Sequence, residues 1–514
     1  MSEIIGRCIG EATPTDVMFI SKKMPKVGDF VVLEYNGKKV LGMIQVLLRG
    51  SVAIPEDIFD PKVVEKIKEL EGEDFYIRGK IKILGELENL KIPRTPAPPG
   101  TEVKLASSED LRKVFGQSDS GVKIGSLLTR PEIPIYLDLN KLVSRHLAIL
   151  AITGYGKSNT VAVLADEILK FKGSILIFDM HSEYTRLALK NGKLNLIPTK
   201  INPLKLTIQE LGILADIHPA QAFIQFRFLK MAYKKAMEDF NKRKIKAKDF
   251  LDRICDYLGE FISSEEYKEK YRDWKKSILA VKNKIEALPE NYKGLLDFSA
   301  PRILDSIKLN HVNVIDLGDL DEEAADVVVS HTLREILQAR KDYKIKGEGL
   351  KFPIFLVLEE AHILAPSEIN TLSKYWIGRI AREGRKFGIG LCLVSQRPKR
   401  LSSDALSQCN NMIILKLVEP SDQRHVQQSS EALSEELLEQ LPSLNVGEAV
   451  IIGPCIKVPA LVKIDKFEGK LEGTDPNVKE EWLKVWEEEE KEREAYLAYT
   501  QELIWKEREK RFGK

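Results

Sequence analysis

A short glycine-containing stretch between an apolar run and a helical pattern constrains this fold more than any other feature. Residues 151–158 read Ala-Ile-Thr-Gly-Tyr-Gly-Lys-Ser, after the run HLAILAI and before a helix expected from about Lys157 to Phe171. At a helix N-terminus, small residues let backbone N–H groups wrap a phosphate chain, a lysine reaches the outer phosphates and a hydroxyl holds Mg²⁺. The stretch predicts an α/β nucleotide-binding fold with ATP and Mg²⁺ as cofactors.

The stretch resembles the Walker A phosphate loop, with one departure. Ala151 stands where the usual pattern has its first glycine, and its Cβ narrows the backbone conformations open to the loop entrance. The core Gly-Tyr-Gly-Lys-Ser is intact. We expect nucleotide contacts from Gly154, Tyr155, Gly156, Lys157, Ser158 and Asn159. Among these, Lys157 is also expected to act in catalysis and Ser158 to bind the metal.

A second apolar run, Phe355–Leu358, ends in two adjacent carboxylates, Glu359 and Glu360. Successive side chains of a strand point to opposite faces, so the two groups can take different roles. The run resembles a Walker B strand with Glu359 where aspartate is commoner. We expect Glu359 to support the Mg²⁺ shell and Glu360 to polarise the water that attacks the γ phosphate.

Polar groups also follow two other predicted strands. Asp179 and Glu183 lie in FDMHSEY, and Gln396 lies in VSQRP. Because ligands bind at the carboxyl edge of parallel strands, we expect Asp179 and Glu183 to bind nucleotide and Gln396 to sense the γ phosphate. A helix-capping role for Asp179 remains an alternative.

Three arginines, Arg379, Arg382 and Arg385, recur at three-residue spacing, so they project from one side of a helix. Guanidinium groups stabilise charge on a transferring phosphate, and in ring ATPases they come from the adjacent subunit. A solvated basic face paired with Glu383 is the alternative. Arg145, just before the phosphate-loop strand, is a further candidate for phosphate contact.

The pattern along the chain divides it into parts of different character. Short β segments with an Asn36-Gly37 hairpin signal predict a small N-terminal barrel, and the proline-rich stretch from Lys91 to Val103 predicts a boundary. Further on, apolar strands alternate with helices, which indicates a mostly parallel sheet. The expected parts are a barrel at 1–95, a linker at 96–130, an α/β core at 131–203 and 305–467, a helical insertion at 204–304 and a helical arm at 468–514.

Charge and cysteine usage limit the environment and the partners. Lysine and arginine number 79 against 77 aspartate and glutamate, so the formal net charge is +2 and a polyanion must be bound by a local basic surface. One such segment, 230–248, carries eight basic and two acidic side chains. Five scattered cysteines and the lack of a long apolar run predict a cytoplasmic protein without a zinc site, a disulfide framework or a membrane partner.

Taken together, SRHLAILAITGYGKSNT, FDMHSEY, LVLEEAHILAP and SQRP resemble the HerA branch of the HerA/FtsK group of ring translocases. The resemblance implies a RecA-like core with a HAS-barrel-like N-terminal domain. It implies a homohexameric, ATP-driven helicase and translocase on double-stranded DNA. Its implied partners are the NurA nuclease and other end-resection proteins in double-strand break repair.

The resemblance also implies roles for the arginines. Arg385, or else Arg382, would act across the subunit interface, and Arg145 would act within its own subunit. Two other functions stay open at this point. One is a secretion or conjugation ATPase of the VirB4 type, and the other is an ATP-assembled ring that serves as a scaffold for a nuclease.

Overall fold

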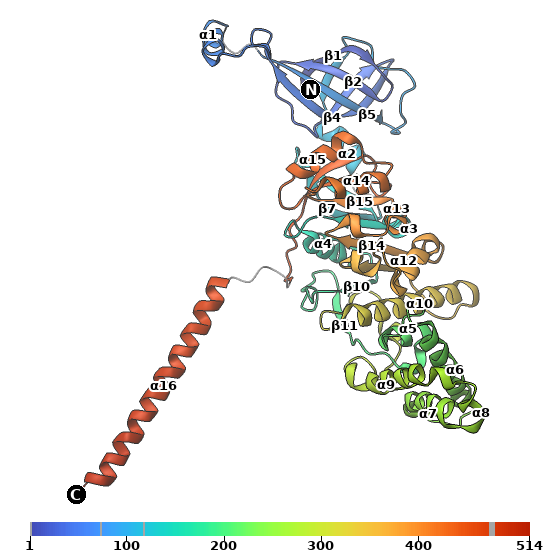
Figure 1. Cartoon of the computed structure of the whole chain (residues 1–514). Coiled ribbons are helices and arrows are strands. Elements are labelled where there is room, and N and C mark those ends of the chain that lie inside the picture. The colour runs from blue at the N-terminus through green and yellow to red at the C-terminus, as the bar shows by residue number, and fades with distance from the viewer. Residues whose placement is uncertain (1–2, 72–74, 117–118, 472–477, 514) are drawn as a thin grey trace. The chain divides into compact units, whose positions relative to one another are not determined.

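The computed structural model describes residues 3–71, 75–116, 119–471 and 478–513. The chain forms two units, Met1–Leu471 and Glu472–Lys514 (Figure 1). Among the described residues, no helix combines the length and the apolar character needed to cross a lipid bilayer.

The N-terminal strands close into a barrel in the order β1-β2-β5-β4-β3-β6, and every neighbouring pair is antiparallel. Side chains on alternate positions, including Phe19, Leu33 and Ile81, fill its interior. Asn36 and Gly37 have positive φ, and Tyr35 pairs with Lys38, so the predicted two-residue hairpin is present. The strands are β1 (Ile4–Ala12), β2 (Asp16–Ser21), β3 (Phe30–Tyr35), β4 (Lys38–Gly50), β5 (Tyr76–Glu86) and β6 (Glu102–Leu105), with α1 (Pro61–Glu71) between β4 and β5.

The barrel extends beyond the expected boundary at residue 95. Strand β6 pairs with both β1 and β3, and without it those two strands would leave open edges. The expected linker at 96–130 is therefore wrong, because it contains β6, α2 (Ser108–Phe115) and β7 (Gly121–Leu127). The proline-rich stretch lies within the barrel domain, where it carries the chain back to the closing strand. The sequence pattern also predicts a strand from Glu73 to Ile83; strand β5 is present from Tyr76 on, and residues 73–74 lie outside the described residues.

The second part of the first unit is built on an eleven-stranded sheet in the order β11-β12-β10-β13-β14-β9-β15-β16-β17-β7-β8. Neighbours from β11 to β15 are parallel, and those from β15 to β8 are antiparallel. The mostly parallel α/β class is thus confirmed, although the sheet begins at β7 and not at residue 131. The further strands are β8 (Pro134–Asp138), β9 (Leu147–Leu150), β10 (Ile175–Asp179), β11 (Lys193–Ile197), β12 (His311–Asp316), β13 (Ile354–Leu358), β14 (Ile389–Ser395), β15 (Asn411–Ile414), β16 (Glu448–Ile452) and β17 (Ala460–Ile464).

The central strands are apolar except at their carboxyl ends, where β10 ends in Asp179 and β14 ends in Ser395. Such runs are typical of a parallel sheet with helices on both faces. Every residue of β9, β10, β13 and β14 is buried. The helices are α3 (Leu139–Arg145), α4 (Lys157–Leu169), α10 (Glu322–Lys346), α11 (Ala361–Leu364), α12 (Leu372–Glu383), α13 (Ser403–Ser407), α14 (Pro420–Ser429) and α15 (Glu435–Gln440).

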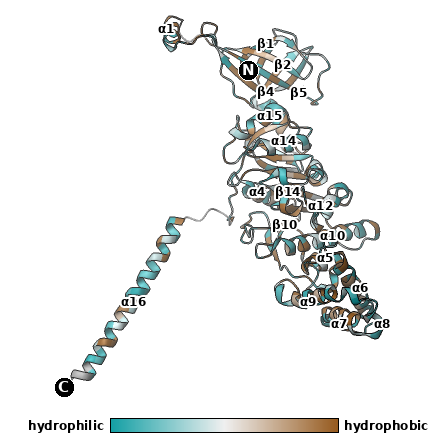
Figure 2. Ribbon diagram, viewed as in Figure 1, coloured by the Kyte–Doolittle hydropathy of each residue, from teal (hydrophilic) through white to brown (hydrophobic). Residues whose placement is uncertain are grey.

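The segment between β11 and β12, which includes the expected insertion at 204–304, is helical. Strands β11 and β12 pair directly, Lys193 with His311, so the insertion leaves and rejoins the sheet at neighbouring strands. Its buried apolar side chains, including Phe228, Phe250 and Phe261, belong to the main hydrophobic core. The ribbons of its helices carry both brown apolar and teal polar positions (Figure 2). The helices are α5 (Ile208–Leu214), α6 (Phe223–Asn241), α7 (Phe250–Ser263), α8 (Glu265–Lys268) and α9 (Lys275–Asn291).

The barrel and the sheet domain share a core within the first unit. Phe30, Val32 and Met43 of the barrel belong to the same buried cluster as the sheet strands. At the rim of this contact, Lys80 Nζ lies 2.6 Å from Glu436 Oε1.

The second unit contains the helix α16 (Val478–Phe512), and its aromatic side chains Trp482, Trp486 and Tyr496 are exposed. The arm was expected from residue 468, but residues 468–471 belong to the first unit, where the Ala188 N–H donates to the Lys470 carbonyl at 3.0 Å. Residues 472–477 of the expected arm lie outside the described residues.

Candidate nucleotide-binding site

The predicted phosphate loop connects the carboxyl end of β9 to the first residue of α4. Gly154 and Gly156 have φ of 80° and 102°, which are left-handed conformations that favour glycine. A Cβ built on Gly154 would meet no atom within 4 Å, so the backbone conformation, not crowding, requires glycine there. Ala151 is buried, and its N–H donates to the Ser395 carbonyl at 3.3 Å. The loop therefore keeps the left-handed geometry of an anion-binding turn despite the alanine.

Lys157 begins α4 and directs its ammonium back toward the loop. Its Nζ lies 3.5 Å from the Ile152 carbonyl oxygen, and only 9% of the residue is exposed. Burial lowers the pKa of Lys157, while the charges of Glu360, Glu359 and Glu183 oppose that shift. A phosphate chain at the N-terminus of α4 would stabilise this buried cation. Ser158 follows in the first turn of the same helix and is half-buried.

Glu359 and Glu360 differ in their surroundings, as expected for adjacent residues at a strand end. Glu359 is buried, and its Oε1 accepts a hydrogen bond from the Tyr184 hydroxyl. Burial raises the pKa of Glu359 to about 8.

Glu360 adopts a left-handed backbone conformation with φ of 44° and ψ of 45°, which is uncommon for a non-glycine residue. Its Oε2 is buried and accepts no hydrogen bond from the described residues, although His362 Nδ1 lies 3.2 Å away. Burial lowers the pKa of His362 to about 4, so this imidazole is neutral near pH 7. A strained backbone and an unpartnered carboxylate oxygen are typical of a group whose partner comes with the substrate.

Gln396 contacts the phosphate loop directly. It follows β14, which pairs with β9 through Ser395 and Leu150, and its Oε1 accepts a hydrogen bond from the Thr153 hydroxyl. A side chain in this position couples the end of β14 to the loop. Sequence reasoning missed Thr153, which lies inside the glycine-containing stretch itself.

Asp179 was expected to bind nucleotide, but its carboxylate is already engaged by backbone groups. Its Oδ1 accepts from the N–H groups of His181 at 3.3 Å and Glu183 at 3.1 Å, and its Oδ2 accepts from the Tyr184 N–H at 2.8 Å. These hydrogen bonds stabilise the turn after β10, which agrees with the alternative capping role of Asp179. Glu183 is half-buried, and its negative charge raises the pKa values of Lys157 and Glu359. Sequence reasoning missed the role of Tyr184, although this residue ends the motif FDMHSEY.

Asn159 is also engaged elsewhere. Its Nδ2 donates to the Asp465 carbonyl at 2.9 Å, and its Oδ1 accepts from the Phe467 N–H at 2.8 Å. The amide therefore ties α4 to the segment after β17, and the expected nucleotide contact is not supported. Tyr155 lies on the loop with Lys416 Nζ 5.1 Å from its ring centroid.

The candidate arginines lie at the opposite edge of the sheet from the phosphate loop. Arg145 precedes the first residue of β9, and Arg385 precedes the first residue of β14, which is parallel to β9. His146 Nε2 donates to the Ala381 carbonyl at 3.0 Å, which brings Arg145 and Arg382 into one region. A seven-residue strand such as β14 spans about 20 Å, too far for an arginine side chain to cross.

Arg145 therefore cannot contact phosphates bound at the loop of its own subunit, so the role expected for it there is wrong. Arg382 and Arg385 are exposed, and Arg145 is half-buried. In contrast, the Arg379 Nε lies 3.2 Å from Glu383 Oε1, and its guanidinium lies 5.4 Å from the centroid of Trp376. Arg382 and Arg385 are thus better placed than Arg379 to reach another molecule.

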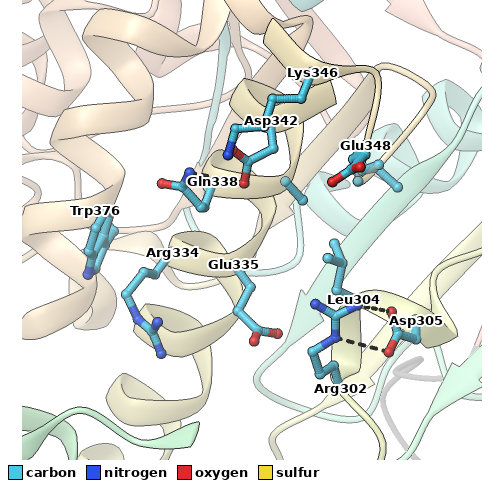
Figure 3. Close-up of a pocket in the computed structure, with 13 residues that line it drawn as sticks. Arg302, Leu304, Asp305, Arg334, Glu335, Gln338, Asp342, Lys346, Glu348 and Trp376 are labelled. Atoms are coloured by element: carbon cyan, nitrogen blue, oxygen red, sulfur yellow. Dashed lines mark hydrogen bonds and ion pairs between the residues drawn. The ribbon is translucent and has the colours of Figure 1, made fainter. Parts of the chain in front are cut away.

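A cavity of about 740 Å³ lies elsewhere, between α10, α12 and the segment before β12 (Figure 3). Some of its polar side chains contact one another: Arg302 Nη2 lies 2.7 Å from Asp305 Oδ1, and the Gln338 amide donates to the Asp342 carboxylate at 3.1 Å. Its lining includes neither the phosphate loop nor the residues after β13, so this cavity is not the nucleotide site.

Within the described ranges, no group of three or more histidine, cysteine, aspartate or glutamate side chains forms a preformed metal site. Mg²⁺ typically keeps several waters and binds through one or two carboxylates together with substrate phosphates. Ser158, Glu359 and Glu360 provide oxygen donors of this kind around the loop.

Comparison with known proteins agrees with the fold. The HerA helicase central domain matches residues 122–336, and the HAS barrel domain matches residues 5–89. The DNA double-strand break repair helicase HerA of Sulfolobus acidocaldarius is 45% identical over 494 residues, covering 94% of this chain and 98% of that protein. The proteins of the same name from Saccharolobus solfataricus and Pyrococcus furiosus are 42% and 34% identical, covering 97% and 94% of this chain and 99% and 98% of the relatives.

A solved structure of VirB4 from Thermoanaerobacter pseudethanolicus aligns with 68% of this chain and 97% of that chain, with a TM-score of 0.49 and 17% identity. The family assignment rests on the matches over nearly the whole chain. This protein belongs to the HerA helicase family.

Proposed function

We propose that this protein is a cytoplasmic, ATP-driven ring translocase that moves along double-stranded DNA in double-strand break repair, as a homohexamer acting with the NurA nuclease and other end-resection proteins. Relatives that carry the name DNA double-strand break repair helicase match it over nearly its whole length. The observation that carries the oligomeric part is the position of the phosphate loop and of Arg382 and Arg385 at opposite ends of the parallel strands β9 and β14. A site that needs both must be completed by a neighbouring copy.

The residues of the loop region fit ATP and Mg²⁺. Lys157 would bind the outer phosphates at the N-terminus of α4, and Ser158 and Glu359 would hold the metal. When bound, Mg²⁺ neutralises charge that develops on the β and γ phosphates. Glu360 would orient and polarise the attacking water, since its Oε2 is buried and accepts no hydrogen bond from the described residues. Gln396 would report the γ phosphate to the loop through Thr153.

Mixing two inactive variants tests completion of the site by a neighbour. Lys157→Ala removes the lysine at one edge of the sheet, and Arg385→Ala removes the arginine at the other. In a mixed ring, some interfaces join an intact loop of one variant to an intact arginine of the other. We expect each variant alone to have little ATPase activity and the mixture to recover a clear fraction of it.

Arg379→Ala is the matched control, since Arg379 lies on the same helix and already pairs with Glu383. It should keep its ATPase activity. A mixture that stays as inactive as its components would contradict the shared site. An Arg385→Ala protein with normal activity would move the role to Arg382, which the same mixing experiment can test.

The DNA part is tested by the ATPase rate with and without linear duplex DNA over a salt series. Stimulation that weakens with salt supports a motor that contacts the phosphate backbone. Hydrolysis that ignores DNA at every salt concentration would point to a protein-directed ATPase of the VirB4 type. A Glu360→Gln ring that still supports full nuclease processing would favour the scaffold function.

A further inference from the structure

The turn after β10 is fixed by hydrogen bonds of its own. The buried Asp179 carboxylate accepts three backbone N–H groups from residues 181–184. The Ser182 hydroxyl donates to Asp316 Oδ1 at 2.8 Å, and the Thr185 hydroxyl donates to the Ser182 carbonyl at 3.1 Å. Ser182 has a φ of 58°, so the chain reverses sharply at this point. These contacts fix the position from which Tyr184 projects.

This turn lies directly beside the carboxylates after β13. Strands β10 and β13 pair in parallel, Phe178 with Leu358, and the Glu359 N–H donates to the Phe178 carbonyl at 3.2 Å. Tyr184 is completely buried, and its hydroxyl donates to Glu359 Oε1. A buried tyrosine has two rotatable bonds, both restricted by the packing around the ring. Its hydroxyl is therefore held against one oxygen of the carboxylate.

We propose that Tyr184 is a positioning residue that orients Glu359 for the Mg²⁺ of the bound nucleotide. The hydroxyl occupies Oε1 and leaves Oε2 for the metal shell. Hydrogen bonds to the ligands of a metal orient them, and loss of such a partner typically weakens metal affinity 10- to 100-fold. Asp179 contributes by shaping the turn that presents Tyr184. This inference rests on the assignment of Glu359 to Mg²⁺ in the proposed function.

Tyr184→Phe tests the proposal, because it removes the hydroxyl and conserves the ring. Binding of a non-hydrolysable ATP analogue is measured over a Mg²⁺ series and in EDTA. We expect unchanged affinity in EDTA, and about a tenfold higher Mg²⁺ concentration for half-maximal enhancement of binding. The Mg²⁺ requirement of ATP hydrolysis should rise in parallel, with most of kcat recovered at saturating Mg²⁺. Tyr233→Phe is the matched control, since the Tyr233 hydroxyl donates to the Leu206 carbonyl at 2.9 Å, in the helical insertion.

Two results with Tyr184→Phe would overturn the proposal. An equal loss of analogue affinity with and without Mg²⁺ would mean that the hydroxyl only maintains the local fold, and an unchanged Mg²⁺ series would mean that it does not act on the metal. Glu359→Gln is run alongside. If Glu359→Gln leaves the Mg²⁺ series unchanged, the premise about Glu359 fails and the proposal fails with it. The ring translocase is judged separately by the mixing experiment, which does not involve Glu359.

Discussion

His146 should make the stability of this protein sensitive to mild acid. This residue lies between α3 and β9 and is 2% exposed. Its Nδ1 accepts from the Leu391 N–H at 3.1 Å, and its Nε2 donates to the Ala381 carbonyl at 3.0 Å, so the folded protein holds the neutral tautomer. Burial lowers the pKa of His146 from 6.5 to about 4. Protonation would place a charge in the interior and remove the acceptor of the Leu391 N–H.

The sign and size of the effect follow from linkage. Between pH 6.5 and 4 the unfolded chain binds a proton at this site and the folded chain does not, so stability falls as the pH falls through this window. From pH 8 to pH 5 the loss is about 2 kcal/mol, or roughly a 30-fold change in the folding equilibrium. Below about pH 4 this contribution no longer changes.

His146→Asn is the informative variant. Asparagine carries a Cβ as histidine does, so the backbone strain of φ 57° and ψ 164° is common to both residues; its side-chain oxygen can accept from the Leu391 N–H, but it does not titrate. Pulse proteolysis in urea at pH 8, 7, 6 and 5 would give the stability of both proteins. Other groups, including His362, titrate in both proteins, so their contributions cancel in the difference. Equal losses for the two proteins between pH 8 and pH 5 would refute the reasoning.

Three further outcomes follow from the contacts around the site. Asn159→Ala should lower the free energy of unfolding by about 1–3 kcal/mol in a urea titration, because two hydrogen bonds to backbone groups are lost. It should leave ATP affinity unchanged, and a large drop in that affinity would restore the nucleotide role of Asn159. Gly156→Ala should abolish nucleotide binding in a fluorescence titration, since φ of 102° strains any side-chain-bearing residue, and normal binding would show that the loop adapts. All five cysteines are buried with raised pKa values, so a thiol reagent at pH 8 should label the native protein slowly and the urea-unfolded protein completely; rapid labelling of the native protein would contradict this.

The sequence predicted those parts of the site whose signals come from residues close together along the chain. The loop from Gly154 to Ser158 needs a strand before it and a helix after it, and both signals lie within about 25 residues. The carboxylates Glu359 and Glu360 follow an apolar run, so their place at the sheet edge could be predicted without knowing the strand order. The buried central strands were equally clear, because a short unbroken apolar run between turn residues is typical of a parallel strand covered on both faces.

The remaining features depend on contacts between distant segments. Strand β6 is short and follows prolines, and its pairing is set by the open edges of β1 and β3. The location of Arg145 opposite the loop follows from strand direction, which the spacing of arginines does not encode. Asp179 and Asn159 are chemically suitable for a nucleotide, yet their partners are backbone groups of the turn at 181–184 and of the segment at 465–467. Polar residue type alone cannot distinguish these uses.

The insertion between β11 and β12 departs and returns at almost the same point. The Ile201 N–H donates to the Leu295 carbonyl at 2.8 Å, and the Asp297 N–H donates to the Ile201 carbonyl at 3.0 Å. These backbone hydrogen bonds hold the two ends of the insertion together. Closing so short a gap with a new loop costs little conformational entropy. The junction between the insertion and the sheet is thus a suitable position for inserting a reporter domain or exchanging helices between relatives. Neither change should alter the register of the sheet that carries the phosphate loop.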